Sequence, residues 1–387
     1  MKQTSIKEII RLEQELEVCL LKQRNGLSKE LLNKREAWSR EVLAYALQQK
    51  EWHLDEKNEI LAKNLIKNPV FIGGCPRSGT TLFSNLLDGH PEICYLPSET
   101  LMFQVFRKKL KYKDQHEQFK IIANDWLQRL ASPTNWGSYF FMGRTTENES
   151  PYVKFIIYLA AWWKWVHQNL RLQHTSPIAS VLLAYATLNG DGMISSRYRF
   201  WLEKSPGNES FYNYLKSDYP DARFIFLLRN PVNVFKSLVH IFKDIEISFP
   251  AHLLIKNRSR YKHLINHHKN EDVQIVTYEN LVQDRKKTIK NALSFLNLMY
   301  HDINNLQTIN GSKTEKNSSF SAAKKDTMLL TNMQKLSIYF MGQPVWHLYT
   351  DNNPVPKKSG EYYFAVMVIY IKNYLQKAIK KVKRLLI

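Results

Sequence analysis

The sequence is poor in cysteine and has no long hydrophobic run. Its three cysteines, Cys19, Cys75 and Cys94, lack the close paired spacing of a zinc site or a redox motif. Such a set does not build a disulfide framework, so a reducing compartment is expected. No stretch reaches about 18 consecutive apolar residues, and the charged start MKQTSIKEIIRLEQELE lacks the apolar run of a signal peptide. These absences predict a cytoplasmic protein without a membrane-spanning helix.

Acidic residues are also scarce. The chain has 35 Asp and Glu against 55 Lys and Arg, a formal net charge of +20. A surplus of this size attracts nucleotides, acidic glycans, acidic peptides, nucleic acid or an anionic membrane. No nucleic-acid-binding motif is recognisable, so nucleic acid is not expected as a partner. With 387 residues, 44% of them hydrophobic, the chain can form one large domain with additions or two domains.

The order of local patterns predicts an α/β protein. Residues 1–66 read as helical, with Ser5 and Glu8 spaced as a capping box and Asn25-Gly26 as a helix stop. Short apolar runs at 70–74, 199–204, 222–229 and 272–279 precede polar or helical stretches, which is typical of a parallel sheet. We therefore predict a P-loop-type parallel sheet flanked by helices over residues 67–320, with helical N-terminal and C-terminal additions.

Two segments stand apart from the predicted sheet. A helix-rich insertion at about 100–195 carries Trp162, Trp163 and Trp165, and aromatic residues on a helix are more often core than ligand-binding. The other segment, 321–387, continues an aperiodic stretch of 311 to about 360 that predicts loops, and it ends in a basic helix. That helix fits peripheral contact with an anionic membrane, or ordinary packing with a solvated basic end.

A phosphate-binding loop is indicated at Gly74–Thr81, between a predicted strand and a predicted helix. Its backbone N–H groups and the start of the helix form an anion site. A nucleoside-triphosphate loop has Lys after its second glycine, whereas here Thr80 follows Gly79 and the cation is Arg77. This pattern favours a smaller, metal-free donor. The predicted donor-binding residues of the loop are Pro76, Arg77, Ser78, Gly79, Thr80 and Thr81.

The run PRSGTTLFSNLLDGHPEI resembles the 5′-phosphosulfate loop of sulfotransferases that use 3′-phosphoadenosine 5′-phosphosulfate (PAPS), especially the protein-tyrosine and related bacterial enzymes. ARFIFLLRNPVNVFKSLVH is similar to the 3′-phosphate element of that family, with Arg229 at a strand end and Ser237 on the next helix. The resemblance spans about 69–320. It implies transfer of a sulfuryl group from PAPS to an acceptor hydroxyl, release of adenosine 3′,5′-bisphosphate, and no metal.

The resemblance also suggests catalytic residues. Lys204 in WLEKSP corresponds to a catalytic lysine that stabilises the leaving phosphate, together with Arg77. Glu99 in LPSET corresponds to the general base, although the alignment needs one extra residue; His90 is the alternative base. Glu203 is excluded from the same role because neighbours on a strand point to opposite faces.

Other features leave more than one interpretation. Tyr278 in VTYENL fits either a nucleotide contact or a core tyrosine. KTEKNSSF at 313–320 falls where many family members place a loop that closes over the nucleotide. The acceptor can be an acidic peptide tyrosine, a glycan or a glycolipid. The alternative functions are a P-loop phosphotransferase and a non-catalytic polyanion-binding protein.

Overall fold

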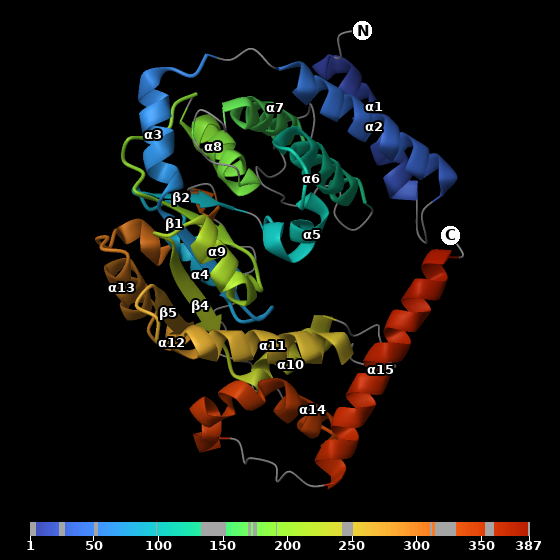
Figure 1. Cartoon of the computed structure of the whole chain (residues 1–387), viewed down its shortest axis with the longest axis vertical. Coiled ribbons are helices and arrows are strands. Elements are labelled where there is room, and N and C mark those ends of the chain that lie inside the picture. The colour runs from blue at the N-terminus through green and yellow to red at the C-terminus, as the bar shows by residue number, and fades with distance from the viewer. Residues whose placement is uncertain are drawn as a thin grey trace.

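A central parallel sheet organises the protein (Figure 1). The computed structural model describes residues 5–22, 28–49, 53–97, 99–132, 152–168, 172, 176–190, 192–241, 251–309, 312–313, 330–352 and 360–385. The sheet comprises β1 (Pro69–Gly74), β2 (Ile93–Leu96), β3 (Phe200–Lys204), β4 (Arg223–Leu228) and β5 (Val273–Thr277). Its strand order is β2-β3-β1-β4-β5, and every neighbouring pair is parallel. The predicted fold class is confirmed.

Alternate residues of each strand belong to two separate apolar clusters, because successive side chains of a strand point to opposite faces. Val70 and Ile72 pack on one face with α4 (Thr80–Leu87), α12 (Tyr278–Gln283) and α13 (Arg285–Phe295). Phe71 packs on the other face, and the centre of its ring lies within 6 Å of the ring centres of Trp201 and Phe224. There the sheet is covered by α9 (Tyr212–Asp218) and α11 (Ala251–His267). Both faces of the sheet are therefore buried, as expected for parallel strands.

The three N-terminal helices are α1 (Ile6–Lys22), α2 (Lys29–Gln48) and α3 (Glu56–Ile66). Of these, α2 joins the insertion, where it packs on α6 (Gln115–Leu130) and α7 (Val153–Gln168), whereas α3 contacts β3 of the sheet. Ser5 accepts from Glu8 N, which confirms the predicted helix start, and Ser28 accepts from Leu31 N at the start of α2. Asn25 and Gly26 lie outside the described residues.

The insertion is a helical layer with a buried aromatic interior. It consists of a π-helical turn (Met102–Phe106), α5 (Arg107–Leu110), α6, α7 and α8 (Pro177–Asn189). Trp162, Trp163 and Trp165 are all buried, which confirms their assignment to the core. Because they occupy several sides of α7, this helix is enclosed by its neighbours, and α2, α6 and α8 all pack on it.

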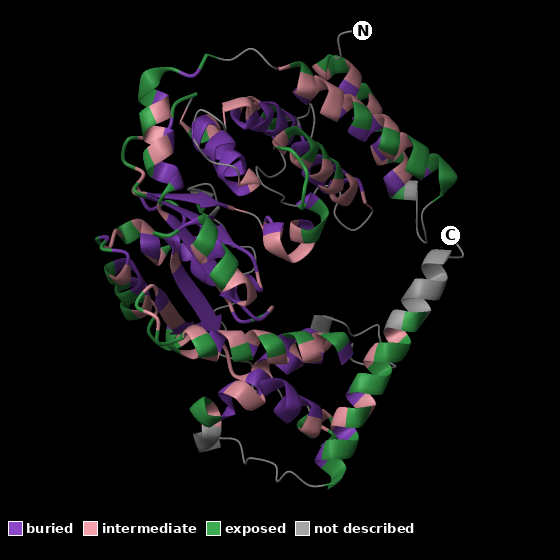
Figure 2. Ribbon diagram, in the orientation of Figure 1, coloured by how far each residue is buried: buried purple, intermediate pink, exposed green. Residues whose placement is uncertain are grey.

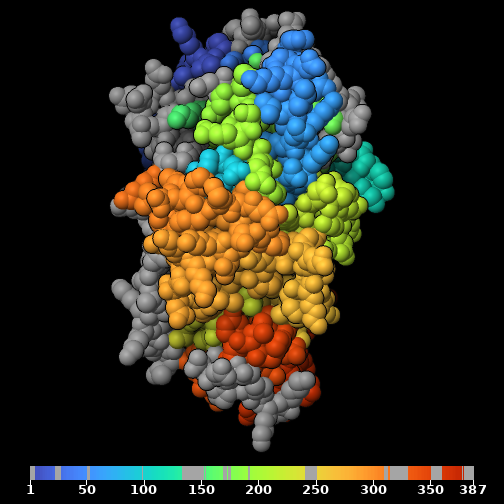
Figure 3. All heavy atoms as spheres, turned by 90° about the vertical axis from the view of Figure 1, so that its left-hand side faces the viewer, coloured from blue at the N-terminus to red at the C-terminus, as the bar shows by residue number. Residues whose placement is uncertain are grey.

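The segment predicted as loops contains helices, so that prediction is wrong. α14 (Asn332–Gly342) begins at a capping box between Thr331 and Gln334 and continues into a 3₁₀ segment, Gln343–Asn352. Ile338 and Met341 of α14 are buried against α10 (Pro231–Ile241) and α11. The final helix, α15 (Gly360–Leu385), is confirmed. Figure 3 shows the red segment around α14 at the opposite end from the blue N-terminal helices, with the orange α12–α13 segment between them, and Figure 1 shows α15 running back from that end toward the level of α2.

Short elements complete the described chain. They are the 3₁₀ turns Asn208–Phe211 and Asp302–Asn305, and an antiparallel pair of two-residue strands, β6 (Thr308–Ile309) and β7 (Ser312–Lys313). No described helix is long and apolar enough to cross a membrane.

Candidate active site

The predicted site residues lie at the carboxyl ends of the strands. Because all five strands are parallel, these ends share one edge of the sheet, where ligands of open α/β folds bind. In sheet order, the residues that end or follow β2, β3, β1, β4 and β5 are Glu99, Lys204, the phosphate loop, Arg229 and Tyr278. Residues as far apart in the sequence as Arg77 and Tyr278, 201 residues from each other, are thereby gathered at one edge.

The phosphate loop has positive φ angles at Gly74, where it begins, and at two residues further along. Arg77 has φ 75° and Gly79 has φ 87°. A Cβ atom at Gly79 would lie 2.4 Å from Cδ2 of Tyr278, so only glycine lets the loop approach that ring. Pro76 is half-buried and Thr80 opens α4, whose first turn has no side-chain cap. The start of α4 is thus available to an anion.

Glu209 is a buried residue that contacts the start of this loop, and it was not predicted from the sequence. Its Oε2 accepts from Gly74 N at 2.6 Å, and its Oε1 lies 3.8 Å from Nε of Arg260. A Cβ atom at Gly73 would lie 2.6 Å from the same Oε2, which accounts for the glycine. Burial raises the pKa of Glu209, while Arg260 and the backbone donors act in the opposite direction.

The phosphate loop and the predicted 3′-phosphate element contact each other directly. Arg77 Nε donates to Ser237 Oγ at 3.0 Å, and an amino group of Arg229 donates to the carbonyl oxygen of Arg77 at 2.8 Å. The Arg229 guanidinium lies 4.0 Å from the centre of the Tyr278 ring. Burial lowers the pKa of Arg229, with Tyr278 and Glu279 acting in the opposite direction. These contacts form one cationic cluster, in which Arg77 meets residues that lie 152 to 201 positions further along the chain.

Lys204 and Glu99 form a second cluster on the same edge. The Lys204 ammonium donates to Glu99 Oε1 at 2.6 Å and to Thr81 Oγ1 at 3.2 Å. The Lys204 side chain is 5% exposed and that of Glu99 is 38% exposed, so the pair lies at the boundary between core and solvent. Because Thr81 and Arg77 belong to one loop, the two clusters are neighbours.

Glu203 points to the other face of β3, as predicted. Its carboxylate accepts from the Thr100 hydroxyl at 2.9 Å and from Asn208 Nδ2 at 2.7 Å. Ser205 donates to the same carboxylate and in turn accepts from Leu101 N at 3.1 Å. This buried network holds the segment that follows Glu99 and so fixes where Glu99 lies.

His90 lies at the opposite edge of the sheet from Lys204. The register pairs Ile93 with Phe200, at the amino ends of β2 and β3. His90 Nδ1 accepts from Glu92 N at 3.1 Å, so the ring proton is on Nε2, which bonds to the Met299 carbonyl at 2.9 Å. Both ring nitrogens are thus occupied, and this position does not suit a base acting with Lys204.

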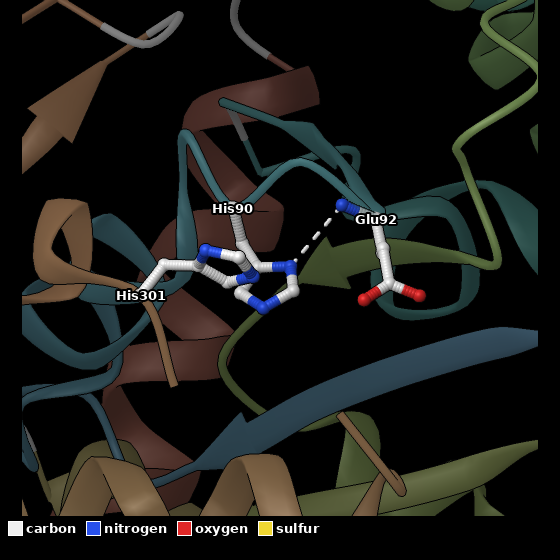
Figure 4. Close-up of side chains that lie close together, drawn as sticks. All are labelled: His90, Glu92 and His301. Atoms are coloured by element: carbon white, nitrogen blue, oxygen red, sulfur yellow. Dashed lines mark hydrogen bonds between the residues drawn. The ribbon is translucent and has the colours of Figure 1, made fainter. Parts of the chain in front are cut away.

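Figure 4 shows the ring of His301 against that of His90, with Glu92 alongside. One ligand atom from each of these three residues lies within 4.8 Å of the others, which is the spacing of a possible metal site. The bonds to Glu92 N and Met299 O already use both nitrogens of His90, and Glu92 forms an ion pair with Arg199 at 3.0 Å. We therefore interpret His90 as a structural link between the start of β2 and the segment after α13.

Comparison with known proteins identifies the family. A family model described as "Sulfotransferase family" matches residues 69–302, which is more than half of the 387-residue chain. The chain belongs to the sulfotransferase family. The match begins at β1 and covers Arg77, Glu99, Lys204, Arg229 and Tyr278. Membership makes this chain a sulfotransferase-family enzyme and implies PAPS as its donor.

The solved sulfotransferase structures that resemble this chain share little of its sequence. The sulfotransferase domain of the Synechococcus PCC 7002 olefin synthase has 17% identity and a TM-score of 0.42, with coverage of 79% of this chain and 100% of that one. A Mycobacterium avium sulfotransferase has 11% identity and a TM-score of 0.38, covering 91% and 97%. One from Alicyclobacillus acidocaldarius has 15% and 0.39, covering 73% and 94%. No curated protein matches this sulfotransferase.

The predicted closing loop of the sulfotransferase is described only at its first residue. Lys313 is in β7, and residues 314–320 lie outside the described residues. The structure thus brings together all the predicted donor-binding and catalytic residues at one edge, and it places the alternative base His90 elsewhere.

Proposed function

We propose that this protein transfers a sulfuryl group from PAPS to an acceptor hydroxyl. The observation that carries the proposal is the pair of bonds from Arg77 to Ser237 and from Arg229 to Arg77. A single phosphate would need only the loop after β1. A second cationic element joined to that loop suits a nucleotide with two separate phosphate groups, as PAPS has.

Two buried polar atoms support the fit of the donor. Ser78 is fully buried, and its hydroxyl has no hydrogen-bond partner among the described residues. The buried Nε of Arg229 likewise has none in the described part of the chain. A buried donor without a partner is costly, and oxygens of the 5′-phosphate at the loop and of the 3′-phosphate beside Arg229 would satisfy these two groups. In the proposed complex Ser78, Thr80, Thr81 and the loop backbone hold the 5′ side, Arg229 and Ser237 hold the 3′-phosphate, and Tyr278 lies beside the nucleotide.

The reaction requires a base and a stabilised leaving group. When bound, PAPS supplies an activated sulfuryl group on a phosphate leaving group. Glu99 accepts the proton of the acceptor hydroxyl, and its partly exposed carboxylate is open to solvent on the acceptor side. Lys204 has three N–H donors, and Glu99 and Thr81 take two of them. The third donor, together with Arg77, stabilises the negative charge that develops on the leaving oxygen.

A cationic cavity lined by residues that follow Glu99 closely in the chain, from Met102 to Lys111, is our candidate for the acceptor side. It has a volume of about 630 Å³, and Met102 and Phe103 line part of it. Arg107, Lys108 and Lys111 also line it, and Arg107 stacks 3.9 Å over the Tyr214 ring. Against these three cations the lining has one carboxylate, Asp218, and this surplus of positive charge favours an acceptor with acidic groups, such as an acidic peptide or glycan. With a labelled donor, Arg107→Ala should raise KM for an acidic acceptor and leave that for a neutral one unchanged.

The first experiment is calorimetric titration of adenosine 3′,5′-bisphosphate and, separately, of ATP with Mg²⁺. We expect the bisphosphate to bind more tightly, and Arg229→Ala to weaken it by about tenfold or more. Arg40→Ala removes the same charge from an exposed position on α2 and should have little effect. Preference for Mg–ATP would instead support a phosphotransferase. Equal effects of both variants would support general polyanion binding.

A further inference from the structure

The last helix exposes a wide apolar face. Seven large apolar or aromatic side chains of α15 are about half exposed or more, with Tyr363 at 61% and Tyr374 at 73%. They are Tyr363, Phe364, Met367, Tyr370, Ile371, Tyr374 and Leu375. Figure 2 shows the green exposed surface along this helix where it leaves the body of the protein.

The exposed residues form one continuous stripe. They follow each other at spacings of one, three and four residues, so at 100° per residue they share a single side of the helix. The opposite side packs against the protein through the buried residues Tyr362, Ala365 and Ile369. After Ile369 no described residue of α15 is buried, and Figure 1 shows the helix projecting past α11. The stripe is therefore not a core face of the described structure.

The charge of α15 narrows the choice of partner. Its sequence contains one acidic residue, Glu361, and six basic residues, of which Lys372 is exposed. The others are Lys377, Lys380, Lys381, Lys383 and Arg384. Pairing with α15 of a second copy would bring together cations with almost no carboxylates to offset them. An anionic surface with an apolar interior matches both the cations and the stripe.

The aromatic content of the stripe points in the same direction. Three of its seven residues are tyrosines and one is phenylalanine. Tyrosine has an apolar ring and a polar hydroxyl, and it concentrates where hydrocarbon meets the headgroups. We propose that α15 lies in the plane of an anionic lipid bilayer, with its stripe buried at the headgroup boundary and its lysines on the lipid phosphates. The protein is thereby held at a membrane surface without a spanning helix.

The test is flotation of the full chain with lipid vesicles at low salt. We expect binding to vesicles of phosphatidylcholine with phosphatidylglycerol and much weaker binding to phosphatidylcholine alone. The triple change Tyr370→Ser, Ile371→Ser and Tyr374→Ser should weaken binding by about tenfold or more, because it removes the centre of the stripe. Lys372→Gln should weaken it by about fivefold.

A matched control replaces equally exposed apolar residues elsewhere. Tyr112 is 89% exposed and Met299 is 74% exposed, and neither belongs to α15. Tyr112→Ser with Met299→Ser should leave vesicle binding unchanged, and thermal unfolding should confirm that every variant is folded. Three results would overturn the proposal: no binding to anionic vesicles, equal binding to neutral vesicles, or full binding by the folded triple variant. A dimer that the triple variant dissociates in light scattering would assign the stripe to a second copy instead.

Discussion

At the scale of single residues, Lys204 is the clearest candidate for a group that acts on the reaction rather than on binding. Lysine is seldom buried without a partner, and Lys204 is 4% exposed with Glu99 and Thr81 as partners. We expect Lys204→Ala to lower kcat by about 100-fold or more, with less than about a threefold change in affinity for adenosine 3′,5′-bisphosphate. Steady-state rates and calorimetry measure the two quantities.

The control for this prediction is Lys63→Ala, which removes a lysine from a surface ion pair on α3. It should change neither kcat nor affinity. Parallel losses of turnover and affinity in Lys204→Ala would mean that Lys204 binds the nucleotide and does not act selectively in the transition state.

His90 gives a prediction about pH. Burial lowers the pKa of His90 below its usual 6.5, with the neighbouring His301 acting in the same direction. A group with a depressed folded-state pKa favours folding above its unfolded pKa, and this contribution is lost as the pH falls through the folded pKa. The free energy of unfolding should therefore fall between pH 7.5 and pH 5.5 partly because of His90. His90→Asn keeps an acceptor for Glu92 N, cannot be protonated, and should make that fall smaller.

Urea unfolding of both proteins at the two pH values measures this effect. The difference between the parent protein and His90→Asn in this decrease of the free energy of unfolding excludes contributions that both proteins share. Among these are the contributions of the buried Glu203 and Glu209, whose raised pKa values act with the opposite sign. His53→Asn, at an exposed position, should behave like the parent protein. An identical fall in His90→Asn would show that His90 does not contribute to the pH dependence.

The positions of site residues were predictable where a local sequence pattern contains them. Arg77, Arg229 and Ser237 stand in recognisable motifs, and the structure joins all three. Glu209 stands in no such pattern. Its role depends on a contact with Gly74, 135 residues away, and on the missing Cβ of Gly73, so only the fold reveals it.

At the scale of elements, the packing of α14 on α10 connects the C-terminal segment to the candidate nucleotide site. A Cβ atom at Gly342 would lie 2.5 Å from the ring of Pro231, the first residue of α10. Gly342→Ala should therefore displace α14 or α10 and cost about 1–3 kcal/mol in the free energy of unfolding. Because Ser237 lies on α10, affinity for adenosine 3′,5′-bisphosphate should also fall. Chemical unfolding and calorimetry measure the two effects.

Gly360→Ala is the matched control, because a Cβ atom there has no neighbour within 4 Å. It should leave the nucleotide affinity unchanged and the stability unchanged or slightly higher. Loss of stability in Gly342→Ala without loss of affinity would show that α14 does not position the nucleotide site.

Strands and helices were predictable where the sequence pattern that indicates them is local and long enough. The predicted runs at 70–74, 199–204, 222–229 and 272–279 correspond to β1, β3, β4 and β5. The missed strand, β2, has only four residues, Ile93–Leu96, and owes its place to pairing with β3. α14 was missed because Ser, Lys and Asn around it obscure its apolar face, and burial against α10 and α11 stabilises it.

At the scale of the whole molecule, one apolar cluster joins the additions to the sheet. It runs from Ile9 in α1 through Phe71 in β1 to Ile369 in α15. The division into 1–66, 67–320 and 321–387 therefore describes the order along the chain, and we propose that these three parts unfold together. Continuity of the core, rather than length alone, is what makes parts of a chain cooperative.

Scanning calorimetry of the full chain should then show one unfolding transition. Adenosine 3′,5′-bisphosphate at about 100 times its Kd should move the whole transition upward by about 3 °C, because binding adds about 2.7 kcal/mol to a chain of this size. If the protein has no site for ATP, ATP at the same concentration should not change the transition temperature. Two transitions, of which only one moves with the bisphosphate, would instead mean that the terminal helices fold independently and that the nucleotide stabilises the sheet alone.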